Sequence, residues 1–236
     1  INEPDKAYEV NSLSTGRLLA TAKKEGVKRF IYLSTIHVYG KELSGEIDEN
    51  HHLGNDHPYA TSHAEGEKFL SKSSQSELTP IVLRLANAFG APVHPEANCW
   101  MLIFNNLCLQ AAKTRKMTLS SASNNMRNFI TLSDVCRGIE HLINNDKNSK
   151  ECSIFNMGDR NLSLLEVASL IQETYKETRS IEIPIIQKAQ RSKSPNDFDF
   201  NTVKLKKSGF IKSSNFKEEI IRLIKFCENN ANLIKL

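Results

Sequence analysis

The chain has 236 residues, of which 39% are hydrophobic and 25% charged, a composition typical of a soluble globular protein and unlike that of a disordered or collagen-like chain. Its 31 basic and 27 acidic residues leave a net charge of +4, an excess too small to indicate a nucleic-acid partner, and no apolar run is long enough to indicate a membrane span. The five cysteines include no CxxC pair, which favours buried reduced thiols over a disulfide framework or a zinc ribbon, and no metal site is expected.

The predicted elements alternate between helices and strands. In the first half of the chain, apolar spacing and turn residues predict a helix over 5–25, a strand over 27–33, a polar loop over 36–57, a helix over 59–72 and a strand over 79–85. Gly26 stops the first helix, and Pro58 stands where the second can begin.

The same alternation continues in the second half. There the pattern predicts a helix over 98–114, a strand over 128–132, helix 134–144, strand 153–157, a helix from 163 to about 174, a strand over 181–186, and helices 202–207 and 216–229. Ser133 is the expected N-cap of helix 134–144, and Ser163 with Glu166 has the spacing of a capping box. The whole pattern predicts an α/β fold with a largely parallel sheet.

Glycines that would cradle a phosphate are not recognisable in this sequence. The ten glycines are scattered, and none forms GxGxxG, GxxGxxG or a P-loop. The sequence therefore contains no nameable turn that brings a pyrophosphate to a helix N-terminus.

Polar side chains gather in four short segments, 33–40, 57–63, 83–92 and 127–135. Ser34 and Thr35 end the first strand, where α/β sheets bind ligands, although such hydroxyls also cap backbone groups in turns. Tyr59 and His63 are spaced to share one helix face. A cation beside a phenol makes it more acidic, which suits acid–base catalysis; the alternative is a packed Tyr.

Arg127 belongs to the last of these segments. Its planar guanidinium is suited to hold a phosphate group. The alternatives are an ion pair with Asp134 or a simple surface charge.

The order of these segments resembles the extended short-chain dehydrogenase/reductase superfamily, the NAD-dependent nucleotide-sugar epimerases and dehydratases. The similar segments are Val10-Asn11, Ser34 to Gly40, Pro58 to His63, Leu83 to Pro92, Arg127 to Val135, and Phe155 to Gly158 with Ser163 to Glu166. An Arg ten residues before a short Asx-capped helix also recurs, as Arg191 and Asn201.

The resemblance implies a partial Rossmann-like, doubly wound parallel sheet with a smaller C-terminal α/β substrate-binding region. Residues 1–90 would be the C-terminal part of the dinucleotide-binding domain, and 91–236 mainly the nucleotide-sugar region, with segments near 127–158 returning to the first domain. The family's first strands and Gly-rich turn would precede Ile1, so an N-terminally truncated sequence is expected.

The resemblance also implies an activity, hydride transfer at a sugar hydroxyl. The implied site residues are Tyr59 as acid/base, Thr35 on the same sugar oxygen and His63 beside them as catalytic residues; Asn11, Ser34, Tyr59 and His63 at the cofactor; and Asn87, Arg127, Arg191 and Trp100 at the substrate. Asn11 would support the active-site end of its helix or the cofactor. For Trp100, a buried hydrophobic anchor is an alternative. The implied cofactor is NAD, with NADP left open.

His63 departs from the family, which normally has Lys at this position, contacting the nicotinamide ribose and lowering the Tyr pKa. Two interpretations remain, a subfamily that works with His or a degenerate protein that binds a nucleotide sugar or dinucleotide without turnover. Ile36 and His37 occupy the positions of the Asp-Glu pair of the family's dehydratases, which favours an epimerase or simple oxidoreductase. His37 could act as an acid–base group, and its alternative is a hydrogen-bonded loop histidine.

The resemblance carries two further expectations. The protein is expected to be a homodimer through helices 5–25 and 58–72. It is also expected to be cytoplasmic, with a nucleotide-sugar substrate and with neither a nucleic-acid nor a membrane partner.

Overall fold

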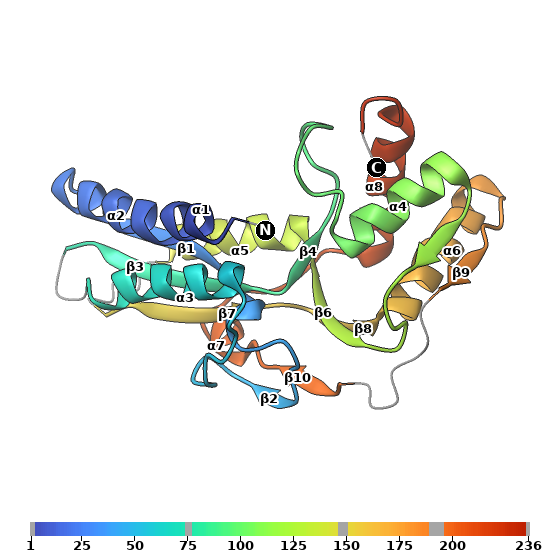
Figure 1. Ribbon diagram of the computed structural model, residues 1–236. Helices are drawn as coiled ribbons and strands as arrows, with labels where there is room; N and C mark the ends of the chain where they lie inside the picture. The colour runs from blue at the N-terminus through green and yellow to red at the C-terminus, as the bar shows by residue number, and fades with distance from the viewer. Residues whose placement is uncertain (1–2, 74–76, 146–150, 189–195, 235–236) are drawn as a thin grey trace. The chain divides into compact units, whose positions relative to one another are not determined.

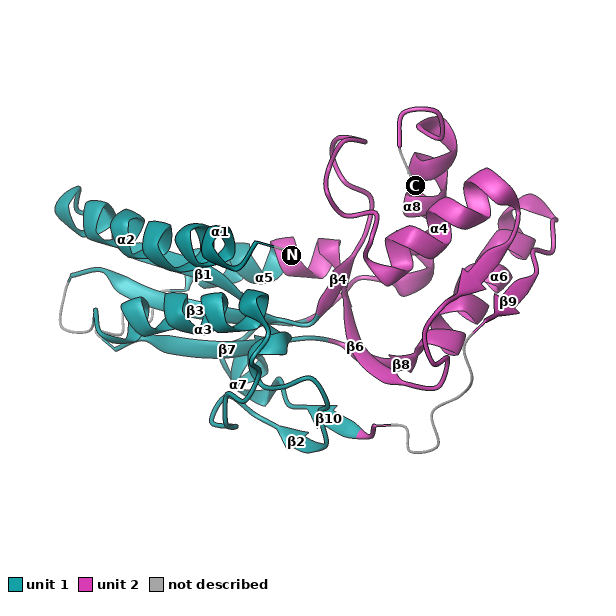
Figure 2. Ribbon diagram, in the orientation of Figure 1, with its two compact units in different colours: residues 1–86, 137–158, 198–211 teal, residues 87–136, 159–197, 212–236 magenta. Residues whose placement is uncertain are grey.

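The computed structural model describes residues 3–73, 77–145, 151–188 and 196–234 (Figure 1). The chain forms two compact units: unit 1 contains residues 1–86, 137–158 and 198–211, and unit 2 contains 87–136, 159–197 and 212–236 (Figure 2). The sequence predicts the first domain boundary at residue 90. In the structure, the chain leaves unit 1 after Ala86 and returns to it twice.

Unit 1 is built around a parallel sheet. Its strands are β1 (Arg29–Thr35), β3 (Thr79–Leu85) and β7 (Ser153–Met157), in the order β1-β3-β7. Thr35 pairs with Leu85, and Leu85 pairs with Met157, so the carboxyl ends of the three strands lie level. A second parallel pair joins β2 (Gly45–Ile47) to β10 (Phe198–Phe200).

Helices cover both faces of this sheet. On one face lie α2 (Ser14–Lys24) and α3 (Pro58–Ser71), whose Leu19 and Leu70 pack with Tyr32 and Val82 of the strands. On the other face, α5 (Leu132–Asn144) and the end of α7 (Val203–Lys207) line a cavity of about 190 Å³ together with β1, β3 and β7. This arrangement confirms the predicted α/β doubly wound fold.

The first helix differs from the uninterrupted helix expected over 5–25. It consists of α1 (Pro4–Tyr8), a π-helical segment η1 (Glu9–Leu13) and α2. Single turns of π-helix often lie at functional sites, and Asn11 is at the centre of this one.

Unit 2 holds a separate apolar core. Strand β6 (Met126–Thr131) pairs in parallel with β4 (Asn87–Phe89) and antiparallel with β8 (Arg160–Ser163), and β5 (Met117–Leu119) pairs with β9 (Ile185–Gln187). The helices that complete it are α4 (Ile103–Thr114), α6 (Leu164–Arg179) and α8 (Phe216–Asn229). The aromatic rings of Phe89 and Phe104 stack at 3.9 Å at its centre.

The elements with the clearest sequence signals form as predicted. Strands 79–85 and 153–157 and helix 216–229 have the expected bounds, and the Ser163–Glu166 capping box of α6 is formed in both directions. The predicted cap of helix 134–144 is wrong: Thr131, not Ser133, accepts the Asp134 N–H, at 3.1 Å. Ser133 lies within α5 and donates to Glu219 instead, at 2.8 Å.

Within the described part of the chain, no helix is both long enough and apolar enough to cross a membrane.

Candidate functional site

A tyrosine and a threonine meet at the carboxyl end of β1. Thr35 is the last residue of this strand and is buried, and Tyr59 lies in the first turn of α3, directly after Pro58. Their side chains lie close enough for Thr35 to affect the pKa of Tyr59. Thr35 Oγ1 also accepts the His37 N–H at 3.3 Å and so caps the short 3₁₀ turn η2 (Ile36–Val38). The alternative capping role of Thr35 is therefore present, and its role beside Tyr59 stays a prediction.

Burial is the main influence on the pKa of Tyr59. It raises the pKa of this phenol above its usual value near 10, and the neighbouring Thr35 side chain opposes the rise. At neutral pH the unliganded chain therefore holds Tyr59 as a neutral phenol.

His63 lies one turn further along α3, with its ring centroid 4.7 Å from that of Tyr59. Burial lowers the pKa of its imidazole to about 4; Glu67 opposes the change and His37 adds to it. The imidazole is therefore neutral at neutral pH. Because a neutral ring carries no positive charge, His63 does not acidify Tyr59 in the way a cationic His63 would.

Asn11 connects the π-helical segment to α3. Its side-chain amide donates to Ser62 Oγ at 3.1 Å, and Ser62 Oγ in turn donates to the Tyr59 carbonyl at 3.0 Å. The carbonyl of Asn11 accepts from the hydroxyls of Tyr32 and Thr15, at 2.9 and 3.0 Å. These bonds tie Asn11 to α3 and β1, and its role at the cofactor stays a prediction.

A buried ion pair lies beneath these residues and was not found from the sequence. Arg84 of β3 and Glu67 of α3 are each 3% exposed. The guanidinium donates to both carboxylate oxygens, with a shortest contact of 2.6 Å. Ser34, an expected cofactor contact, donates its only side-chain proton to Glu67, so its hydroxyl retains only acceptor capacity.

The ion pair extends toward β7 through a tyrosine. Arg84 Nη1 donates to the Tyr39 hydroxyl at 2.8 Å, and that hydroxyl donates to Asn156 Oδ1 at 2.6 Å. The network therefore joins the strand ends of unit 1. The sequence does contain one signal for this ion pair, because Arg84 lies inside the otherwise apolar strand TPIVLRL. A charge buried in such a strand requires a partner of opposite charge.

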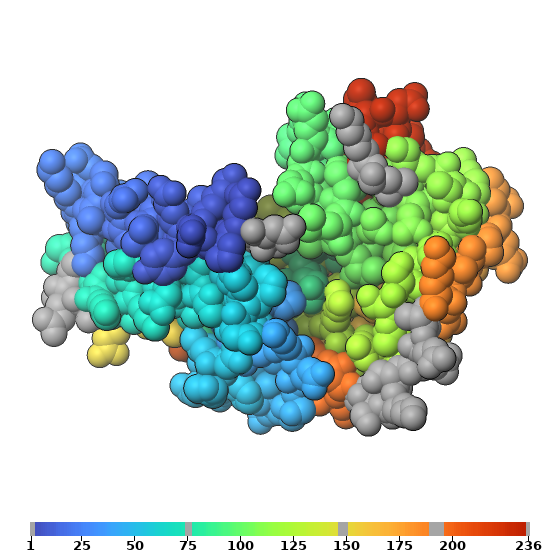
Figure 3. All heavy atoms as spheres, viewed as in Figure 1, coloured from blue at the N-terminus to red at the C-terminus, as the bar shows by residue number. Residues whose placement is uncertain are grey.

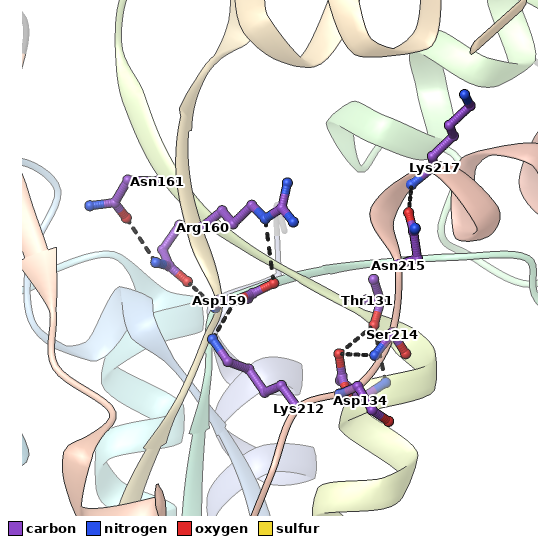
Figure 4. Close-up of polar contacts among 11 residues, drawn as sticks. Thr131, Asp134, Asp159, Arg160, Asn161, Lys212, Ser214, Asn215 and Lys217 are labelled. Atoms are coloured by element: carbon purple, nitrogen blue, oxygen red, sulfur yellow. Dashed lines mark hydrogen bonds and ion pairs between the residues drawn. The ribbon is translucent and has the colours of Figure 1, made fainter. Parts of the chain in front are cut away.

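Three of the expected substrate residues, Asn87, Arg127 and Trp100, lie in unit 2. Asn87 donates its amide to the backbone carbonyl of Asn128 at 2.9 Å. Asn128 is itself buried and bonds Asn161 and the Asp159 N–H, at 2.8 and 3.0 Å. Figure 4 shows Asp159 between Arg160 and Lys212. Asn87 is thus held by a cluster of polar contacts.

Arg127 is exposed, and its guanidinium forms no hydrogen bond or ion pair with the residues that the structure describes. The alternative ion pair with Asp134 is wrong, because Asp134 is fully buried and accepts from Thr131 and from the N–H groups of Ser213 and Ser214 (Figure 4). Arg191 lies outside the described residues.

Trp100 lines a cavity of about 650 Å³ in unit 2, with residues of the loop 96–101, Asn106 and Leu233. Its indole stacks on Phe226 and donates to the Pro95 carbonyl at 2.8 Å. Trp100 is therefore both a packing anchor and a wall of the cavity.

A family model described as the NAD dependent epimerase/dehydratase family matches residues 1–158. Among curated proteins, the dTDP-D-glucose 4,6-dehydratase of Bos taurus is 30% identical over 180 residues, which cover 74% of this chain and 48% of the relative. An uncharacterized UDP-glucose epimerase of Bacillus subtilis is 29% identical over 177 residues, which cover 72% and 51%. The chain thus spans about half the length of the curated relatives it matches.

Among solved structures, RMD from Pseudomonas aeruginosa, complexed with NADPH, has a similar fold. The TM-score is 0.81 at 18% identity, and the match covers 97% of this chain and 76% of the other. At this identity the likeness establishes the fold alone.

Proposed function

The chain belongs to the NAD dependent epimerase/dehydratase family, and from this we propose that the protein is a nucleotide-sugar epimerase or a related NAD(P)-dependent oxidoreductase. The observation that carries the proposal is that Thr35, at the end of β1, and Tyr59, in the first turn of α3, lie close enough for the Thr35 side chain to affect the acidity of Tyr59. Ligands of open α/β sheets bind at the carboxyl ends of the strands.

We assign the chemistry as oxidation at a sugar hydroxyl. Tyr59 takes the hydroxyl proton in its phenolate form as the C=O bond forms, and Thr35 hydrogen-bonds the same sugar oxygen. NAD, when bound, supplies the acceptor for the hydride that leaves the carbon. Thr35 is suited to this task because the backbone fixes it: it ends a paired strand and caps a turn.

The residues that would hold NAD within this chain are Tyr59 and His63. Ser34 and Asn11 are both engaged in protein hydrogen bonds, to Glu67 and Ser62, so we assign them supporting roles. The proposed substrate residues remain Asn87, Arg127, Arg191 and Trp100. The guanidinium of Arg127 makes no hydrogen bond or ion pair with the described residues, so it is available to bind a diphosphate.

We favour epimerisation or simple oxidation over 4,6-dehydration, although the matched relatives include a dehydratase. After Thr35 the chain has Ile36 and His37. Ile36 carries no acid–base group, so no pair of carboxyls follows Thr35 to remove a proton and expel water.

A second candidate is a protein that binds nucleotide sugar or dinucleotide without turnover. The observation that favours it is the raised pKa of Tyr59 next to a neutral His63. This arrangement supplies no preformed phenolate at neutral pH.

One experiment separates the two candidates. The full-length protein is incubated with NAD and with UDP-glucose or dTDP-glucose, and both reduced nicotinamide absorbance and sugar products are followed. We expect turnover that falls by about a hundredfold or more in Tyr59→Phe, in line with loss of a general base, while nucleotide-sugar binding persists. Binding without turnover in the unmodified protein would favour the second candidate, and absence of both would contradict each.

We also propose the homodimer expected from the family, in a cytoplasmic protein. The N-terminal helical segment, at the surface of unit 1 in Figure 3, carries exposed apolar side chains, Tyr8, Val10 and Leu18, and Phe69 of α3 is also exposed. Sedimentation of the full-length protein is expected to give a dimer, and Leu18→Glu to weaken it.

A further inference from the structure

The imidazole of His63 has a defined set of neighbours within unit 1. Its Nδ1 lies 3.0 Å from the phenol oxygen of Tyr32, and that oxygen lies 2.9 Å from the carbonyl oxygen of Asn11. The other ring nitrogen, Nε2, has no hydrogen-bond partner among the residues that the structure describes. Tyr32 therefore stands between a histidine and a backbone carbonyl.

Counting protons assigns the tautomer. A carbonyl oxygen can only accept, so the Tyr32–Asn11 contact is a hydrogen bond only when Tyr32 donates its single proton to Asn11. Tyr32 must then accept from His63, which places the imidazole proton on Nδ1. The opposite assignment leaves two oxygens 2.9 Å apart with no proton between them. Because a neutral imidazole carries one N–H, Nε2 has a lone pair and can accept a hydrogen bond.

Gly66 makes room for this arrangement. It lies three residues after His63 on α3, and a Cβ built there would lie 2.5 Å from both the Tyr32 hydroxyl oxygen and the Asn11 carbonyl oxygen. Real Cβ atoms do not come this close, so the contact between Tyr32 and Asn11 at this face of the helix requires a residue without a side chain.

The groups around the imidazole favour its neutral form. Tyr32 approaches from β1, Tyr59 and Glu67 belong to α3, and His37 belongs to η2. The negative charge of Glu67 is matched by Arg84 in the buried ion pair. Burial then outweighs Glu67, and the pKa of His63 falls.

We propose that Tyr32 is a positioning residue that holds His63 as its Nδ1–H tautomer, so that Nε2 acts as a hydrogen-bond acceptor for a hydroxyl group of the bound dinucleotide or nucleotide sugar. The identity of the ligand rests on the proposed function, whereas the tautomer does not. A lysine at this position could only donate a hydrogen bond to the ligand hydroxyl, whereas Nε2 of His63 accepts one, so donor and acceptor are exchanged in this chain.

The tautomer is measured directly by heteronuclear NMR of histidine-labelled full-length protein at pH 7. The His63 signals are identified by their loss in His63→Gln. We expect a protonated Nδ1 and an unprotonated Nε2. A protonated Nε2 in the unmodified protein would overturn the proposal, whatever the variants do.

Tyr32→Phe tests the positioning role, because it removes only the hydroxyl. We expect His63 to lose its preference for Nδ1–H, while Tyr8→Phe, at an exposed tyrosine of the same unit, leaves the tautomer unchanged. A retained Nδ1–H preference in a folded Tyr32→Phe protein would contradict the role of Tyr32. Where Tyr32→Phe is unfolded, the spectrum of the unmodified protein still decides the tautomer.

Two titrations identify the source of the hydroxyl. NAD and UDP-glucose are added separately to saturation, and the Nε2 resonance is followed. A shift with NAD assigns the hydroxyl to the dinucleotide, and a shift with UDP-glucose assigns it to the sugar nucleotide. No shift with either bound ligand would overturn the acceptor role. Because none of these readouts requires turnover, failure of the proposed activity is distinguishable from failure of this inference.

A double-mutant cycle gives the functional readout. We expect Tyr32→Phe to lower kcat/KM by up to about tenfold, the effect of one net hydrogen bond. In the His63→Gln background we expect no further loss, since Tyr32 acts through His63. Equal losses in both backgrounds would indicate a structural role only.

Discussion

At position 63 a neutral imidazole stands beside the phenol of the proposed base. The His63 ring lies edge-on to Tyr59, and burial rather than any neighbouring charge sets both of their pKa values. His63 therefore supplies no cation to stabilise a phenolate at Tyr59. A lysine at this position would supply one, and the acidity of Tyr59 would then depend on charge.

This contrast predicts the effect of His63→Lys. An ammonium beside Tyr59 stabilises the phenolate and lowers its pKa, and a base works only when it is deprotonated. We therefore expect the acid limb of the pH–kcat/KM profile, measured for sugar oxidation by the full-length protein, to move to lower pH. His63→Gln is the control, since it removes the imidazole without adding charge. An acid limb that is the same in all three proteins would show that position 63 does not tune Tyr59.

The same histidine couples stability to pH. Its pKa falls from 6.5 to about 4 on folding, so between these values the unfolded chain binds more protons at His63 than the folded chain. The free energy of unfolding should then decrease as pH falls from about 6.5 to about 4, by an amount on the order of 3 kcal/mol over the whole window. Above pH 6.5 this contribution is fully present.

Denaturant unfolding at several pH values checks this linkage. His63→Gln cannot titrate, so its free energy of unfolding should fall less steeply between pH 6.5 and 4 than that of the unmodified protein. The slope is the readout, because the substitution also removes the contact with Tyr32 and shifts the absolute value. Equal slopes would mean that the folded chain does not hold His63 neutral.

At the scale of elements, α3 carries two glutamates in very different surroundings. Glu67 is 3% exposed and paired with Arg84, whereas Glu65 pairs with Lys68 at the surface. Removing one partner of a buried pair leaves an uncompensated charge, which costs about 3–5 kcal/mol. An exposed pair of this kind contributes at most about 1 kcal/mol.

Glu67→Gln is therefore expected to lower the free energy of unfolding by several kcal/mol, and Glu65→Gln by about 1 kcal/mol or less. Both changes remove one negative charge from the same helix, so the comparison isolates burial. Chemical denaturation of the two full-length variants measures the difference. Similar losses would imply that the Glu67–Arg84 pair is not what holds α3 against β3.

Sequence patterns located the elements that are long enough to show a period. Strand β3 and helix α8 have their expected bounds, and the strand expected over 181–186 forms only at its end, as β9, but β4 and β5 span three residues each, too few for any alternation to be recognised. Helix α4 begins at Ile103 rather than at residue 98, since apolar composition does not fix a helix start without a cap. The π-helical turn around Asn11 leaves apolar spacing almost unchanged, so it was not predicted.

Some residues of the candidate site could be predicted from the sequence and others could not. Thr35 and Tyr59 are predicted together because short motifs and the strand-end rule locate them, and the structure brings them close enough for Thr35 to affect the pKa of Tyr59. Tyr32 and Arg84 were missed, since each acquires its role from a contact with a residue far away in the chain. Local sequence patterns do not predict such contacts. Only the charge of Arg84 inside β3 indicates that a partner is present.

At the scale of the whole chain, the proposed roles separate by unit. The proposed acid/base group, Tyr59, belongs to unit 1, and the proposed diphosphate contact, Arg127, belongs to unit 2. Each unit is assembled from discontinuous segments, so the chain passes repeatedly between them. We therefore expect a substitution at the diphosphate contact in unit 2 to change KM more than kcat.

Arg127→Gln tests this separation. A guanidinium that binds a diphosphate in both ground and transition states contributes uniform binding, so its loss raises KM and leaves kcat nearly unchanged. We expect KM for the nucleotide sugar to rise by about 10- to 100-fold, the range for a charged hydrogen bond. Arg222→Gln, the same charge change at another exposed arginine of unit 2, is the matched control and should leave KM unchanged. A fall in kcat without a change in KM would instead place Arg127 at the reacting centre and contradict its assignment to the diphosphate.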